Sequence, residues 1–154
     1  MSNEPMKIPI NYTEESETLR KLLALKGSPV AIKFATSKEE IPTGLEELDK
    51  TIRHCSMVNL ARNEGKIFYA TSGKHECNGG AWALGLREIT PTLKNGDFYF
   101  KLGKYESAAA CKRTIDNVPH LGSGDTFATM YSPLEKTPFT PHVVMIVTTP
   151  RNML

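Results

Sequence analysis

The spacing of apolar and polar residues along the chain predicts a mixture of helices and strands. Acidic residues after Asn11, apolar positions at Leu19 and Leu22, and a glycine at position 27 predict a helix over Asn11–Lys26. Apolar side chains alternating with smaller or polar ones predict a strand over Val30–Phe34. Further helices are predicted over His54–Glu64, with Gly65 as its C-terminal cap, Gly79–Arg87 and Tyr105–Ile115. Further strands are predicted over Lys66–Thr71, Phe98–Phe100, Thr126–Tyr131 and Val143–Val147.

Strands mixed with helices, without regular alternation of the two, predict an α+β fold. We expect a mixed sheet of about four to five strands packed against several helices. Val30–Phe34 and Val143–Val147 should be strands of one sheet, with their apolar residues facing the helix Asn11–Lys26 or its neighbours. The β-branched run at Val143–Val147 indicates a buried strand, and Phe98–Phe100 is expected in the core of the sheet. Residues 1–10 are expected to be an extended lead-in.

Length and composition fit one globular domain over residues 1–154 with one hydrophobic core. The formal charge is +2, from 19 basic and 17 acidic residues, which gives no case for a nucleic acid or an anionic membrane as partner. Neither a membrane span nor a secretory signal is visible, so a cytoplasmic location is expected. An odd and sparse set of three cysteines agrees with that compartment, where thiols are kept reduced.

The cysteines are the main chemical lead. Cys55 is placed at the start of one predicted helix, and Cys77 comes just before Gly79, Gly80 and another. Free backbone amides at such positions stabilise a thiolate, the form that ligates metals or attacks electrophiles, and the two glycines would let backbone approach a bound group. Cys111 lies inside a predicted helix. Its neighbours Lys112 and Arg113 could steady an anionic cluster or ligand.

Other interpretations of these residues remain open at this point. Free cysteines are often inert core residues, and spacings of 22 and 34 residues match no zinc or ferredoxin pattern. His54 and His75 stand close to cysteines, so each is a candidate for a mixed metal site or for a surface position. A thiol enzyme using Cys77 with His75 would need an unusual turn, because residues two apart in an extended segment point to opposite sides. No hydrolase, zinc-protease or phosphate-loop motif names a reaction, so whether the chain is an enzyme stays undecided.

Four strings go beyond composition. They are Gly27-Ser28-Pro29-Val30-Ala31-Ile32-Lys33, Cys55-Ser56-Met57-Val58-Asn59-Leu60-Ala61, Cys77-Asn78-Gly79-Gly80-Ala81 and Tyr131-Ser132-Pro133-Leu134. In this order the chain resembles the archaeal and anaerobe-rich bacterial family known as domain of unknown function 169, from about Leu19 to Leu154. The resemblance implies that the positions of Cys55 and Cys77 have a role. It also implies that an oxygen-sensitive cofactor would suit a protein of anaerobic organisms. Relatives continue with a further cysteine-containing segment, so this chain is expected to lack a C-terminal part.

Two functions follow as expectations. In the first, Cys55, Cys77 and Cys111 ligate a [4Fe–4S] cluster or another metal, with a redox partner protein, and their sulfurs lie within about 6–7 Å of one another. In the second, the cysteines are inert. The protein then binds a small anion or metabolite at a pocket rimmed by Lys112, Arg113, Gly79 and Gly80.

Overall fold

The computed structural model describes residues 11–153, and the predicted lead-in over residues 1–10 lies outside them. The α-helices are α1 (Thr13–Leu22), α2 (His54–Glu64), α3 (Asn78–Ala83), α4 (Pro91–Lys94), α5 (Asp97–Lys101) and α6 (Ala108–Asp116). The strands are β1 (Val30–Ala35), β2 (Phe68–Thr71), β3 (Ala128–Pro133) and β4 (Val143–Met145). Short 3₁₀ turns are η1 (Lys38–Glu40), η2 (Ser72–Lys74), η3 (Leu134–Lys136) and η4 (Pro150–Met153). The predicted helix over His54–Glu64 is confirmed, and Gly65 caps it at φ 67°.

The four strands form one sheet in the order β2-β3-β1-β4, which confirms the α+β class. All three pairings between these strands are antiparallel, whereas a mixed sheet was predicted. Among residues 11–153, parallel pairing occurs only as isolated bridges, Glu47 to Tyr69 and Ile52 to His75. The long β1–β3 register, Val30 opposite Pro133 through Ala35 opposite Ala128, makes these two strands the centre of the sheet.

Each face of the sheet is covered by a different helix. Alternate side chains of β1 point to opposite faces of the sheet, as in any pleated strand. Val30 and Ile32 pack with α2, whereas Ala31 and Ala35 belong to the cluster that includes Leu19 of α1. The prediction that the apolar residues of β1 face a helix is therefore confirmed. The hydrophobic side chains that pack on the sheet form two clusters, one on each face.

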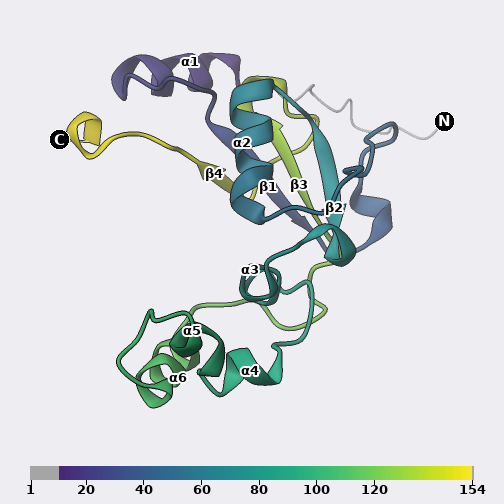
Figure 1. Cartoon of the computed structure of the whole chain (residues 1–154). Helices are drawn as coiled ribbons and strands as arrows, with labels where there is room; N and C mark the ends of the chain where they lie inside the picture. The colour runs from purple at the N-terminus through teal and green to yellow at the C-terminus, as the bar shows by residue number, and fades with distance from the viewer. Residues whose placement is uncertain (1–10, 154) are drawn as a thin grey trace.

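The remaining helices, α3 to α6, gather beyond one end of the sheet, in the lower part of Figure 1. A third cluster lies among them and contains Trp82, Leu93, Cys111 and Ile115. The predicted strand Phe98–Phe100 is wrong, because these residues lie in the helix α5. Only Tyr99 packs into the third cluster, and its two aromatic neighbours are exposed. An isolated run of three aromatic residues carries no period, so it cannot distinguish a strand from a helix.

The strand at Val143 is present but is not buried. Val143 and Val144 are 43% and 38% exposed, because β4 is an edge strand that pairs with β1 alone. An apolar run predicts a strand, but it cannot say whether that strand lies at the centre or at the edge. No helix within residues 11–153 is long and apolar enough to cross a membrane.

Candidate functional site

Two of the cysteines begin neighbouring helices. The parallel bridge between Ile52 and His75 brings the chain before α2 beside the chain before α3. Cys77 is the N-cap of α3, as predicted, and its sulfur accepts a hydrogen bond from the Gly80 amide at 3.4 Å. Cys55 is exposed in the first turn of α2. The two thiols therefore stand at the end of the sheet that meets α3.

The third cysteine belongs to the helical cluster. Cys111 is fully buried. Burial raises the pKa of the nearby Tyr99 phenol, with further contributions from Cys77 and Cys111. The Tyr99 hydroxyl also fills the space beside Gly79, because a Cβ there would lie 3.0 Å from its oxygen. The space beside the Gly79 backbone, where a bound group was expected, is thus occupied by the side chain of Tyr99 in α5.

The three cysteines do not form a metal centre in this structure. Within residues 11–153 no group of three or more histidine, cysteine, aspartate or glutamate side chains is placed to hold a metal ion. One thiol is exposed on α2 and another is sealed among α3–α6. The described residues therefore offer no ready metal site, and the predicted three-cysteine cluster stays a prediction.

The two histidines instead contact hydroxyl groups of the central strand β3. His54 Nδ1 lies 2.8 Å from the hydroxyl of Tyr131, and His75 Nε2 lies 3.0 Å from Oγ1 of Thr129. Burial, together with the charges of His54 and Arg87, lowers the pKa of His75 to about 4. Burial also lowers the pKa of His54 and raises that of Tyr131. These groups are held neutral at pH 7 and tie α2 and η2 to the centre of the sheet.

The cations predicted to rim a pocket beside Cys111 lie on the exposed side of α6. Lys112 Nζ pairs with Asp116 Oδ2 one turn further along α6, at 2.5 Å, and both side chains are half-exposed. Arg113 is exposed on the same helix. The hollows described below are lined by other residues.

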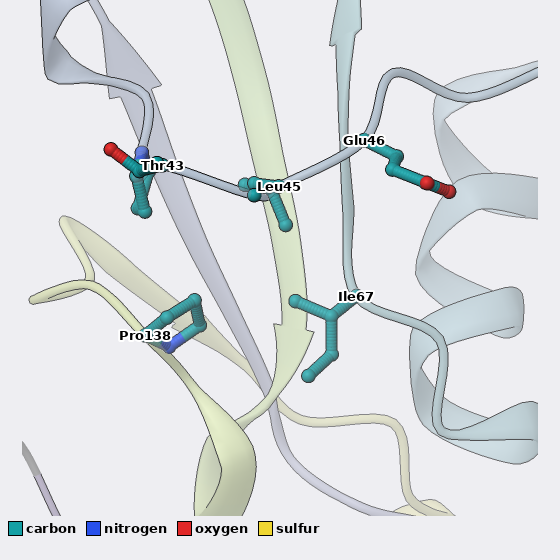
Figure 2. Close-up of a pocket in the computed structure, with 7 residues that line it drawn as sticks. Thr43, Leu45, Glu46, Ile67 and Pro138 are labelled. Atoms are coloured by element: carbon teal, nitrogen blue, oxygen red, sulfur yellow. The ribbon is translucent and has the colours of Figure 1, made fainter.

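One hollow, of about 350 Å³, lies between the segment 42–46 and the chain at Ile67 and Pro138. Figure 2 shows Leu45, Ile67 and Pro138 around the same space, whereas the side chain of Glu46 points away toward α2. Its lining carries no charge other than that of Glu46. Ligand sites need a few convergent polar groups to orient what they bind, and the polar side chains in this lining are only Thr43 and Glu46, the second of which points away.

A second hollow of about 380 Å³ is of the opposite character. It lies where α1 ends, α2 ends and β3 runs into η3, at the far end of α2 from Cys55. Its lining is mostly polar and contains four cations, namely Arg20, Lys26, Arg62 and Lys136. None of the four makes an ion pair with a carboxylate within 4.0 Å in the part of the chain that the structure describes. We call this hollow the cationic cleft.

The backbone between α1 and β1 shapes the cleft. The helix ends at Leu22, before the predicted Lys26, because Ala24 adopts a left-handed conformation with φ 46°. The Leu25 amide then bonds to the Arg20 carbonyl and the Ala24 amide to that of Lys21, which is the Schellman arrangement. A left-handed alanine costs roughly 1–2 kcal/mol. The turn directs the chain sharply back toward α2.

Gly27 is needed where this turn meets α2. A Cβ at this position would lie 2.7 Å from Cγ of Arg62 and 3.1 Å from the Arg62 carbonyl oxygen. The next amide, that of Ser28, donates to the same carbonyl at 3.2 Å. The absence of a side chain at Gly27 thus lets Arg62 lie along the wall of the cleft.

A carboxylate holds the other side of the cleft together. Glu135 accepts hydrogen bonds from the hydroxyl of Ser16, at 2.8 Å, and from that of Ser28, at 2.6 Å. Although burial opposes it, these bonds and the nearby charge of Arg20 hold the pKa of Glu135 below its usual value. Since both carboxylate oxygens are engaged, Glu135 joins α1, the segment before β1 and η3 beside the four cations.

Sequence reasoning missed the cleft, although it had singled out the strings that build it. Gly27-Ser28-Pro29 and Tyr131-Ser132-Pro133-Leu134 meet there, with the Leu134 amide bonded to the Pro29 carbonyl at 2.9 Å. The string from Cys55 to Ala61 ends one residue before Arg62. The four cations, however, are scattered over 117 positions of the sequence, from residue 20 to residue 136. Only the fold brings them together.

Comparisons with known proteins agree with the resemblance noted in the sequence. The chain is 42% identical over 138 residues to the uncharacterized protein MJ0308 of Methanocaldococcus jannaschii, a match that covers 89% of this chain and 59% of that protein. The chain thus spans less than two thirds of that relative's length. No solved structure matches the chain. The model of domain of unknown function 169, described as uncharacterised ArCR, matches residues 18–154. The chain therefore belongs to this family.

Proposed function

We propose that this chain is a cytoplasmic protein that binds a small anion in the cationic cleft. The observation that carries the proposal is the set of four cations without carboxylate partners around one polar hollow of about 380 Å³. This is the anion-binding alternative expected from the sequence, located at a different surface. The cytoplasmic location is supported by the three free cysteines, which are typical of a reducing compartment.

The chemistry of the cleft favours a phosphate-like dianion over a single carboxylate. Arginine offers a planar fork of donors that matches phosphate, and lysine acts as a compact point charge. The cleft has two of each, Arg20 and Arg62 with Lys26 and Lys136. Two carboxylates also line the cleft: Glu64 pairs with Lys66, and Glu135 keeps its negative charge near Arg20 while it accepts bonds from two serine hydroxyls. Since the lining has four cations and two carboxylates, an entering anion meets an excess of positive charge.

The surroundings of two cysteines fit structural roles, which agrees with a function that does not use thiols. Cys111 is sealed in an apolar cluster, where free cysteine behaves as a small hydrophobe. Cys77 serves as the cap of a short helix. An iron–sulfur function stays a prediction that needs its own test, since no group of three ligands in the described residues is placed to hold a metal ion.

Isothermal titration with inorganic phosphate, at constant ionic strength in chloride, tests the proposal. We expect saturable binding of one phosphate per chain. Replacing Arg62 with Gln should weaken it by about tenfold or more, because a charged hydrogen bond contributes on the order of 1.5–3 kcal/mol. Lys136→Gln should weaken it in the same direction with a smaller effect, since lysine makes no bidentate contact.

Arg113→Gln is the matched control. It removes the same charge from an exposed position on α6, outside the cleft, and should leave phosphate affinity unchanged. If Arg113→Gln abolishes binding and Arg62→Gln does not, the anion binds beside the helices α3–α6 and the cleft is not the site. If the wild-type chain binds no phosphate, sulfate or acetate, the proposed function is wrong.

A further inference from the structure

A smaller hollow adjoins the cationic cleft. It measures about 160 Å³ and is lined by Ala24, Lys26, Arg62, Val147, Thr148, Thr149 and Asn152. Lys26 and Arg62 line both spaces. The two cations therefore stand on a shared wall, and a ligand held by them in the cleft can extend into the second space, which we call the side hollow.

The side hollow differs from the cleft in its surface. Apart from Lys26 and Arg62 it contains no charged residue, and its exposed surface is mostly apolar. Val147 contributes to it and is 42% exposed. The hydroxyl of Thr148, which also lines the hollow, already donates to the Leu23 carbonyl at 3.3 Å. Such a surface gains free energy when an apolar group covers it.

We propose that the anion bound by this protein is a phosphomonoester with a short apolar group, its phosphate in the cleft and its apolar group in the side hollow. This inference rests on the proposed function and names the class of ligand for that same site. A dianionic phosphate matches the four cations, and the shared wall of Lys26 and Arg62 places the ester oxygen at the boundary between the two spaces.

The small volume limits the apolar group. A space of about 160 Å³ is below the roughly 300–1,000 Å³ of sites that enclose drug-sized ligands. It accepts a short aliphatic chain and not the paired acyl chains of a membrane lipid. The ligand is thus a soluble phosphomonoester rather than a lipid headgroup.

The experiment compares inorganic phosphate with methyl, propyl and hexyl phosphate by isothermal titration. Affinity of the wild-type chain should rise about two- to fourfold for each methylene group that enters the side hollow, and then level off when the hollow is full. Val147→Ser should flatten this dependence and leave the affinity for inorganic phosphate unchanged. Val144→Ser removes an equally exposed valine from β4, outside the hollow, and should keep the full dependence.

The outcomes separate the two proposals. Phosphate binding with no dependence on chain length, or with the same dependence in Val147→Ser, would overturn the inference and leave the proposed function standing. Absence of binding to every phosphate, and also to sulfate and acetate, would overturn both. Binding to vesicles that contain phosphatidic acid, without binding to soluble alkyl phosphates, would also overturn the inference and assign a lipid source. Thermal melts of each variant establish that it is folded before titration.

Discussion

The imidazole of His75 contacts Thr129 through one nitrogen only: Nε2 lies 3.0 Å from the Thr129 hydroxyl, while Nδ1 is buried without a hydrogen-bond partner in the described residues. Burial and the nearby charges of His54 and Arg87 lower the pKa of His75 to about 4. In the unfolded chain the pKa is about 6.5. Between these values the unfolded state binds a proton that the native state does not.

The free energy of unfolding should therefore fall as the pH drops from 6.5 to about 4, by on the order of 3 kcal/mol from His75 alone. His54, whose pKa is also lowered, adds to the loss in the same direction. Urea denaturation at pH 7, 5.5 and 4.5 measures this slope. In the variant His75→Gln the slope should be clearly smaller, and an equal slope in both proteins would show that His75 is not responsible.

Ala24 offers a test of backbone strain next to the cleft. It is the single non-glycine residue with positive φ among residues 11–153. Ala24→Gly should raise the free energy of unfolding by about 0.5–1 kcal/mol, because glycine adopts this conformation without the Cβ clash and loses part of the gain to its greater chain entropy. As a comparison, Ala110→Gly within α6 should lower it by up to about 1 kcal/mol. Urea midpoints for both variants give the two signs, and a loss in Ala24→Gly contradicts the strain.

Gly27→Ala should reduce phosphate affinity without removing any charge. The new methyl group would lie 2.7 Å from Cγ of Arg62, so the arginine must leave the wall of the cleft. We expect a loss comparable to that of Arg62→Gln, measured by the same titration. Gly73→Ala is the control, since its Cβ would meet nothing within 4 Å. Unchanged affinity in Gly27→Ala would mean that the position of Arg62 does not matter for binding.

The cysteines distinguish a core role from a cluster. If Cys111 is a core residue, Cys111→Ser should lower the free energy of unfolding by about 1–3 kcal/mol, because it buries a hydroxyl. Cys55→Ser, at an exposed position, should change it by no more than about 0.5 kcal/mol. Neither should change the visible absorption of protein purified and reconstituted with iron and sulfide under anaerobic conditions. Iron–sulfur absorption in the wild type that both variants lose would instead establish the predicted cluster.

Local patterns in the sequence determined most of the secondary structure. The start and end of α2 follow from its apolar spacing and from Gly65, because these signals are short-range and agree with the burial of the helix. The alternation of larger and smaller side chains over Val30–Phe34 predicted β1, although this central strand is buried on both faces. The same reasoning correctly placed Cys77 at a helix start. It failed at Phe98–Phe100, where three residues hold too little periodicity, and at the end of α1, where Ala24 takes a conformation usually reserved for glycine.

Only the tertiary structure decided which reactive and charged side chains lie close together. The sequence drew attention to three cysteines because thiols are rare and reactive, yet the fold puts one on the surface of α2, one at a cap and one in a core. The four cations of the cleft carry no local signature, since isolated arginines and lysines are ordinary on any surface. They become a site because β1 and β3 pair along their length and bring the ends of α1, α2 and β3 to one point, a contact between residues more than one hundred positions apart.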